Sequence, residues 1–425
     1  MMVIRPSGLS RKLLLRSTLL ILLVAGSLPA QTGTTPQNGT TPPAVPPGPP
    51  VASGRGRGGR GGGGGTPVDA VVSPEVHADR SVTLRFRAPL ATQVDIVGEL
   101  MQGKGPQPMT RDPNGLWSAT LAPVPPEIWS YNFRVQGIDI PDPSNPAVKP
   151  VPPGFAMSSF VEVPGDGAAF YDSRRVPHGD VRMTTYESKA MGVTRALWIY
   201  TPPGYDKSKA KYPVVFLLHG NGEGLNGWVM NGRVNIILDN LIADGKARPM
   251  IVVMPQGHAL QAPNVGPLVR ITGESGMFSP RFPTDLLDGI IPMVEKDYRV
   301  IANADNRALA GLSMGGGQAL SIGFSHPELF HYVLGFSAAI NGQFLNIDEP
   351  LKLLTANPAA TNARLRLLWI STGKQDFLRV ADENLDKLLT EKGVRHTFVE
   401  TEGAHVWSVW RNNLFAAAPL LFKEK

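Results

Sequence analysis

A serine, a histidine and an aspartate in the second half of the chain have the types and spacing that nucleophilic catalysis needs. The serine is Ser313, at the centre of the G-x-S-x-G sequence of residues 311–315. Glycines on either side of such a serine permit a tight strand-to-helix turn, in which larger side chains would collide. The apolar run RALA precedes this sequence and a stretch of small, helix-compatible residues follows it. Ser313 is therefore the predicted nucleophile.

A serine hydroxyl attacks well only when a base removes its proton, and four histidines follow Ser313 in the chain. His326 and His331 flank the end of the helix that Ser313 would start, far from its first turn. His396 lies inside the strand-like run HTFVE, where a structural role is expected. His405 lies in the loop TEGAH, after that strand and before a helix. His405 is the predicted base.

The base needs an acid that orients it, and this acid is expected at the end of a strand between Ser313 and His405. Asp376 fits, because it follows the apolar run LRLLWIST and a glycine. Asp382 and Asp386 fall on the next predicted helix and are interpreted as solvated charges. Asp376 is thus the predicted third member of the triad.

Attack on an ester creates an oxyanion, which two backbone N–H groups are expected to bind. The first is that of Met314, directly after the nucleophile. The second is expected in the loop after PVVFLLHG, where Asn221 is the first choice and Gly222 the next. His219 of that loop is expected to shape it rather than to transfer protons. The sequence contains no metal-ligand spacing such as H-E-x-x-H and no phosphate-binding glycine loop; it implies no metal and no cofactor.

The elements around these residues alternate between strands and helices. Short, almost continuous apolar runs are typical of strands that are buried on both faces, and four of them are PVVFLLHG, PMIVVMP, RALAGLS and LRLLWIST. Helical stretches separate them. This alternation predicts an α/β fold with a doubly wound, mostly parallel sheet. The chemistry of such folds lies at the carboxyl ends of the strands.

A small all-β unit is predicted before this sheet, over residues 68–165. The runs VTLRFRA and VDIVGEL alternate apolar and polar residues, and an Asn-Gly turn precedes LWSATL. In IWSYNFRV, the aromatic residues Trp129, Tyr131 and Phe133 fall on one strand face. This row could stack on sugar rings, but the core face of a β-sandwich is the preferred interpretation, because the opposite face is strongly polar.

The first 67 residues have a different composition. Residues 1–30 combine a basic start, the apolar run LLILLVAG and small residues before Gln31, which predicts a cleaved signal peptide and export to the periplasm or the medium. The alternative is an uncleaved anchor, but the apolar run is shorter than the roughly 20 residues that span a bilayer. Residues 31–67 predict a disordered Pro/Gly/Arg-rich linker.

Charge and cysteine content exclude some classes of partner. Seven basic residues and no acidic residue precede residue 66, so the formal net charge of +6 comes from the N-terminal segment and the rest is nearly neutral. No nucleic-acid partner is therefore expected. The chain has no cysteine, which excludes disulfides and a cysteine-linked lipid anchor, so no stable membrane anchor is expected. The sequence does not indicate an oligomeric state.

The phrases HGNGEG, RALAGLSMGGGQAL, GKQDF and GAHVWSVWRNNL resemble family-one carbohydrate esterases over residues 178–425. These include feruloyl and acetyl xylan esterases and esterase D, and they are related to enterochelin esterases. The resemblance implies the α/β-hydrolase fold, the triad of Ser313, Asp376 and His405, and an oxyanion hole formed by the amides of Asn221 and Met314. Residues 68–165 resemble a family-48 carbohydrate-binding module, which has an immunoglobulin-like sandwich.

From these features we expect an exported serine esterase that removes feruloyl or acetyl groups from xylan-type polysaccharides or oligosaccharides. Among the aromatic residues of the loops, Trp228, Phe278 and Trp407 are the predicted substrate contacts. Two other functions remain open. One is hydrolysis of an enterochelin-type siderophore trilactone, and the other is glycan binding by a protein whose esterase domain is vestigial.

Overall fold

The computed structural model describes residues 70–149, 157–259 and 278–423. Thr66–Lys425 form one compact unit. The signal peptide predicted for residues 1–30 and the linker predicted for residues 31–67 lie outside the described residues. No helix in the described ranges is long and apolar enough to cross a membrane.

The N-terminal part of this unit, here called the β domain, consists of two antiparallel sheets around their own core. Tyr131 and Phe133 are fully buried in that core, which confirms the core interpretation for both. One sheet has the order β1 (Glu75–Val76), β2 (Val82–Arg87), β6 (Leu116–Leu121) and β5 (Thr110–Arg111). The other has the order β4 (Gln107–Pro108), β3 (Val94–Val97), β7 (Glu127–Val135), β10 (Ser158–Val163) and β9 (Val148–Lys149), and β8 (Ile138–Ile140) pairs with β7.

The C-terminal part, here called the catalytic domain, is built on one eight-stranded sheet. The first two strands in chain order pair antiparallel, β12 also pairs antiparallel with β14, and the other neighbours are parallel. Across the sheet the order is β11 (Asp180–Ser188), β12 (Val193–Thr201), β14 (Ile251–Pro255), β13 (Val214–Leu218), β15 (Arg307–Leu312), β16 (Tyr332–Phe336), β17 (Leu367–Gly373) and β18 (Thr397–Thr401). The predicted mostly parallel α/β sheet after an all-β unit is confirmed.

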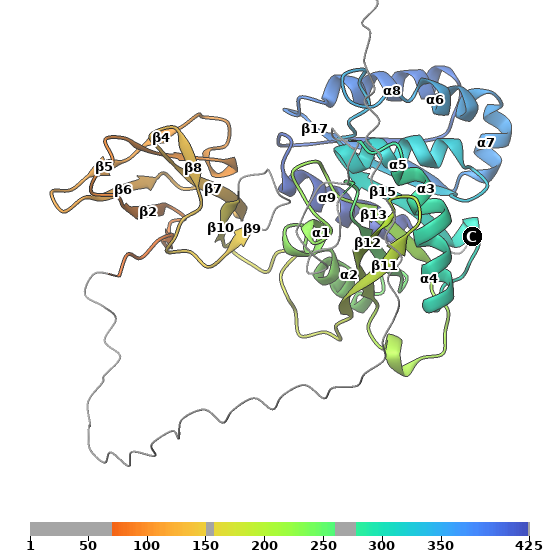
Figure 1. The fold of residues 1–425 in the computed structure, drawn as a ribbon, viewed down its shortest axis with the longest axis horizontal. Coiled ribbons are helices and arrows are strands. Elements are labelled where there is room, and N and C mark those ends of the chain that lie inside the picture. Colours follow the sequence, from red (N-terminus) through yellow and green to blue (C-terminus); the bar gives the residue numbers. More distant parts are fainter. Residues whose placement is uncertain (1–69, 150–156, 260–277, 424–425) are drawn as a thin grey trace, which may run out of the picture. The chain divides into compact units, whose positions relative to one another are not determined.

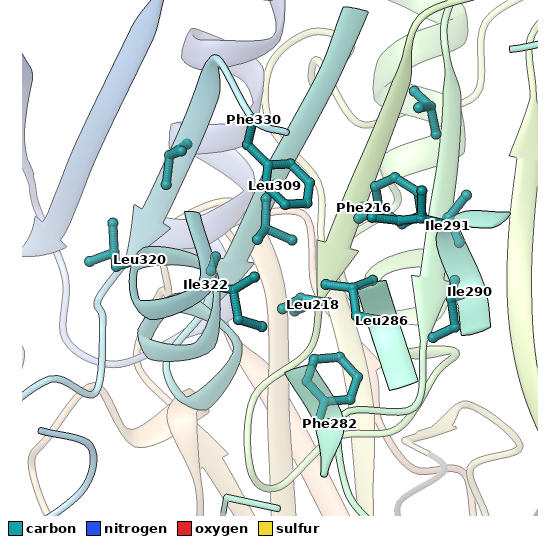
Figure 2. Close-up of a cluster of buried hydrophobic side chains, with 14 of the residues drawn as sticks. Phe216, Leu218, Phe282, Leu286, Ile290, Ile291, Leu309, Leu320, Ile322 and Phe330 are labelled. Atoms are coloured by element: carbon teal, nitrogen blue, oxygen red, sulfur yellow. The ribbon is translucent and has the colours of Figure 1, made fainter. Parts of the chain in front are cut away.

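Helices cover both faces of this sheet (Figure 1). One face packs against α3 (Phe282–Thr284), α4 (Ile291–Asp297), α5 (Met314–Ser325), α6 (Asp348–Thr355) and α8 (Arg379–Glu391). The other packs against α1 (Gly227–Met230), α2 (Val234–Ala243) and α9 (Trp407–Ala417). The short helix α7 (Pro358–Arg364) follows α6. Figure 2 shows part of the first core, which includes Phe216 and Leu218 of β13 together with Phe282 and Leu286. The central strands β13, β14 and β15 are buried on both faces, which explains why their sequences are almost entirely apolar.

Salt bridges join the β domain to the catalytic domain. Glu127 of β7 accepts a hydrogen bond from the guanidinium of Arg411 in α9, and the side chain of Arg411 is 1% exposed. Glu162 of β10 pairs with Arg233, just before α2, at 2.7 Å. The Glu127–Arg411 pair is removed from water, whereas the Glu162–Arg233 pair is partly exposed.

A second buried ion pair ties the antiparallel strands to the helical layer. The Arg195 and Asp285 side chains are both 0% exposed and lie 2.7 Å apart, and Asp285 also accepts a hydrogen bond from the Tyr186 hydroxyl. Arg195 donates further to the carbonyl oxygen of His258, beyond the end of β14.

Replacing Arg195 with methionine is expected to lower the free energy of unfolding by about 3–5 kcal/mol, because it leaves the Asp285 charge buried without its partner. Urea denaturation of the purified protein measures this loss. Lys352→Met is the matched control, since it removes an ion pair that lies in solvent, and it is expected to leave the unfolding midpoint unchanged. Equal midpoints for the Arg195 variant and the wild type would contradict the expectation.

Candidate active site

Ser313 lies at the sharp turn between β15 and α5, with backbone angles φ 52° and ψ −115°. A positive φ is uncommon for a residue that has a side chain, and such backbone strain is concentrated at functional sites. A Cβ atom at Gly315 would lie 2.6 Å from the carbonyl oxygens of His219 and Leu218, and one at Gly311 would lie 2.3 Å from the Gly315 oxygen. The elbow therefore requires glycine at both positions of the G-x-S-x-G sequence.

The structure brings the three predicted triad residues together. The Nε2 atom of His405 lies 2.9 Å from the Ser313 Oγ, and its Nδ1 atom lies 2.8 Å from an Asp376 carboxylate oxygen. Asp376 follows the end of β17, and His405 lies in the loop between β18 and α9. With the proton on Nδ1, the imidazole donates to the carboxylate and can accept the serine proton at Nε2, which is the arrangement that a serine nucleophile needs.

Asp376 is in a setting that keeps its carboxylate ionised. Burial by itself raises the pKa of Asp376, but hydrogen bonds from His405 and from the backbone N–H of Leu378 outweigh it and hold the pKa below its usual value. The ring of His405 contacts those of Phe377, with centroids 4.6 Å apart, and Trp410, at 4.9 Å. The imidazole is therefore fixed by aromatic contacts as well as by its hydrogen bonds.

Asp382 corrects one interpretation of the sequence. It was expected to be a solvated charge on α8, but it is fully buried. Burial, together with the nearby charge of Asp376, raises the pKa of Asp382 well above its usual value. A charged residue on a helix is usually exposed, but the packing of α8 turns Asp382 inward, near Asp376. Asp386 does lie closer to solvent and pairs with His396 at 2.8 Å.

The loop after β13, residues 219–223, passes beside the nucleophile. A Cβ atom at Gly220 would lie 3.4 Å from the Ser313 Cβ. The next residue, Asn221, lines the same cavity as Ser313, and its carbonyl oxygen accepts a hydrogen bond of 2.8 Å from the His258 Nε2. Asn221 lies beside the nucleophile and Met314 directly follows it, so their amides remain the predicted oxyanion donors.

The buried ring of His219 stabilises this loop through hydrogen bonds. Its Nδ1 donates to the Gly220 carbonyl oxygen, and its Nε2 accepts from the backbone N–H of Gly257. Burial, with a smaller effect of His258, lowers the pKa of His219 to about 3, so the imidazole is neutral at ordinary pH. A neutral, fully hydrogen-bonded ring shapes the loop.

A cavity of about 330 Å³ opens above the serine, within the size range of ligand sites. Its lining includes two aromatic residues that sequence reasoning missed, Phe344 and Phe377. The Phe377 side chain is 67% exposed. Its position directly after Asp376 was a usable signal, because a residue next to the triad acid must lie near the site. The β domain adds Glu99 and Lys149 to the lining, and no local sequence signal marks either of them.

The three predicted substrate contacts differ in burial and in whether they line the cavity. Trp228 is 1% exposed, donates to the Leu218 carbonyl oxygen and packs on Phe336, so it belongs to the core and the prediction for it is corrected. Its apolar size and loop position suggested a cleft wall, but the short helix α1 turns it inward. Trp407 lines the cavity although only 2% of it is exposed. Phe278 is partly exposed and remains a prediction.

The described ranges contain no group of three or more His, Cys, Asp or Glu side chains that could hold a metal ion. The polar groups of the cavity instead suit covalent catalysis by a hydroxyl. They comprise a nucleophile, a base with its orienting acid, and backbone donors beside them.

Comparison with known proteins gives a consistent picture. The model of the "Putative esterase" family matches residues 188–421. An endo-1,4-beta-xylanase/feruloyl esterase of Xylanibacter ruminicola is 30% identical over 356 residues, which cover 82% of this chain and 46% of that protein. The chain thus spans less than half the length of this curated relative.

The similar solved structures include two esterases. A CE1 ferulic acid esterase from Anaeromyces mucronatus, solved in complex with ferulic acid, is 25% identical with a TM-score of 0.50, and the match covers 59% of this chain and 93% of that one. The enterobactin esterase of Shigella flexneri is 20% identical with a TM-score of 0.60, covering 80% and 92%. At that identity the second likeness shows the fold.

Proposed function

Because this chain belongs to the "Putative esterase" family and is related to feruloyl esterases, we propose that it is an exported serine carboxylic-ester hydrolase. Its substrates are acylated plant polysaccharides or oligosaccharides, with feruloyl esters preferred. The observation that carries the proposal is the hydrogen-bonded series from the Ser313 Oγ through His405 to Asp376. The same geometry assigns a role to each group.

The reaction proceeds through an acyl-enzyme. His405 accepts the Ser313 proton as the Oγ attacks the ester carbonyl carbon, and the amides of Asn221 and Met314 bind the oxyanion. His405 then gives its proton to the sugar oxygen as its bond to the carbonyl carbon breaks, so the sugar leaves as the alcohol and the acyl group stays on Ser313. A water molecule, deprotonated by His405, attacks this second ester; the bond to the Ser313 Oγ breaks, His405 returns the proton to that oxygen, and the carboxylic acid is released. Asp376 holds the imidazole orientation and stabilises its charged form throughout.

The proposed preference for feruloyl groups rests on the relatives and on the cavity. Two relatives are named as feruloyl or ferulic acid esterases. Phe344 and Phe377 line the cavity, and Phe377 offers an exposed ring beside His405. A planar aromatic acyl group would bury far more apolar area there than an acetyl group would, and burial of such a group contributes a few kcal/mol.

Two parts of the proposal rest on sequence. The composition of residues 1–30 supports export to the periplasm or the medium. The resemblance of residues 68–165 to a family-48 carbohydrate-binding module supports a glycan ligand for the protein as a whole. Half-buried Trp129 is the residue of the aromatic row in β7 that retains exposed ring surface.

A panel of esters tests the substrate. The kcat/KM is expected to be highest on methyl ferulate or feruloylated arabinoxylan, lower on acetylated xylan and lowest on a catecholate trilactone. Phe377→Ala is expected to lower kcat/KM on methyl ferulate about tenfold and to change that on ethyl acetate less than about threefold, since only the aromatic acyl group loses a contact. Faster hydrolysis of the trilactone than of any feruloyl or acetyl ester would transfer the assignment to siderophore hydrolysis.

A further inference from the structure

Glu223 is a buried acidic residue close to the nucleophile that the reaction scheme does not use. It lies two residues after Asn221, and only 4% of it is exposed. Its backbone N–H donates to the Gly220 carbonyl oxygen at 3.1 Å, which closes a turn around Asn221 and Gly222. Any movement of Glu223 therefore moves the peptide that carries the proposed oxyanion donor.

Three separate parts of the chain hold the Glu223 carboxylate. The indole N–H of Trp407, in α9, donates to Oε1 at 3.1 Å, and the amide of Asn231, just after α1, donates to Oε2 at 2.7 Å. The ammonium group of Lys149, in β9 of the β domain, forms an ion pair with Oε1. A buried carboxylate is costly unless it is paired and hydrogen-bonded, and here donors occupy both oxygens.

We propose that Glu223 is a positioning residue for the oxyanion loop, and that Lys149 couples the β domain to the active site through it. This inference rests on the proposed serine mechanism. Glu223 touches no reacting atom; it acts through the placement of the Asn221 amide.

Contacts on both sides of Gly222 hold the loop. On one side His258 holds the Asn221 carbonyl oxygen, and on the other side Glu223 is clamped by its three donors. The space around the carboxylate is limited, since a Cβ atom at Gly227 would lie 3.2 Å from Glu223 Oε2. A displacement of about 1 Å in a positioning group can cost about 10² in rate, so the clamp is expected to affect turnover.

The charge of Lys149 affects the protonation of Glu223, because the Glu223 carboxylate is buried. Burial raises the pKa of Glu223, Lys149 opposes this rise, and the nearby carboxylate of Glu99 adds to it. The other facing groups are the neutral Trp407 and Asn231, and Arg411 donates to the Asn231 carbonyl oxygen. Without Lys149 the pKa of Glu223 rises further, so protonation reaches it at a higher pH and one acceptor of the clamp is lost.

The first test is Glu223→Gln. Its kcat on a short alkyl ester is expected to fall about tenfold or more with KM within about twofold, because the oxyanion forms only after binding. The variant is expected to fold, since the amide of Asn231 can rotate to accept from the new side chain, and its Oδ1 has no hydrogen-bond partner within the described residues. Thermal unfolding checks the fold.

The second test is Lys149→Met, which leaves the loop sequence intact. The loss in kcat relative to the wild type is expected to be larger at pH 6 than at pH 8, because the lower pH favours the protonated form of a Glu223 whose pKa is raised and which has lost its counter-ion. In the double variant with Glu223→Gln this difference between the two pH values is expected to vanish, because an amide does not titrate. A purely structural role for Lys149 would give the same loss at both pH values.

Glu162→Gln is the matched control, since it breaks the Arg233 contact between the same two domains away from the cavity. Its kcat is expected to stay within about twofold of the wild type. Wild-type kcat in Glu223→Gln, or an equal loss in the control, would overturn the inference. An active Ser313→Ala variant would instead overturn the proposed mechanism, so the two failures are distinguishable.

Discussion

Ser313→Ala is expected to lower kcat for aryl acetate hydrolysis by about 10⁴–10⁶, the usual cost of losing a serine nucleophile. The reason is that no acyl-enzyme can form without the Oγ atom, whereas binding and the backbone donors persist. Thermal unfolding is expected to show a midpoint close to that of the wild type, because alanine occupies the same turn and loses only the bond to His405.

A covalent probe gives an independent measurement for the serine. A fluorophosphonate is expected to add one label per chain to the wild type and none to the Ser313→Ala protein, as read by intact-protein mass. Retention of more than about a tenth of the wild-type rate in a contamination-free preparation would remove Ser313 from the mechanism.

His405→Ala is expected to be nearly as damaging, with kcat reduced by about 10⁴–10⁶, since it is the group within hydrogen-bond reach of the Ser313 Oγ that can take the proton. The measurement is the steady-state rate on the same aryl acetate. The fluorophosphonate is expected to label this variant slowly, because Ser313 is present but is no longer deprotonated.

His396→Ala is the matched control for the base. His396 pairs with Asp386 through Nε2 and bonds the Val394 carbonyl oxygen through Nδ1, so both ring nitrogens have structural partners. Its kcat is expected to remain close to the wild-type value. An inactive His396 variant beside an active His405 variant would show that the base is assigned to the wrong histidine.

The strands and the positions of Ser313, Asp376 and His405 could be predicted because their signals are local. Strands buried on both faces are apolar in sequence, and Ser313 and Asp376 each follow the end of one, whereas His405 follows the partly exposed edge strand β18. The glycine at position 311 reports a steric requirement within the elbow itself, because its Cβ would meet the Gly315 carbonyl oxygen. Because the residue types that the reaction needs coincide with the ends of predicted strands, one sequence was sufficient to predict the three triad residues.

The remaining features depend on contacts between distant parts of the chain. Trp228 and Asp382 have the composition expected of a loop aromatic and a helix-surface charge, and only the packing of α1 and α8 makes them buried. Lys149 reaches Glu223 across more than 70 residues of sequence. Its surroundings in the sequence are Pro-rich and without periodic pattern, so nothing local indicates that the β domain contributes to the catalytic cavity.

The buried salt bridge between Glu127 and Arg411 bears on how such proteins are assembled from modules. A binding module that is simply fused to an enzyme can be removed or exchanged. Here the β domain supplies Glu127 and the catalytic domain supplies Arg411, so each domain carries the counter-ion of the other's buried charge. Separating the two would expose Arg411 and the apolar residues around it, and would also remove Lys149 from the catalytic cavity. A boundary drawn between the two domains by sequence therefore separates two charges that are buried against each other.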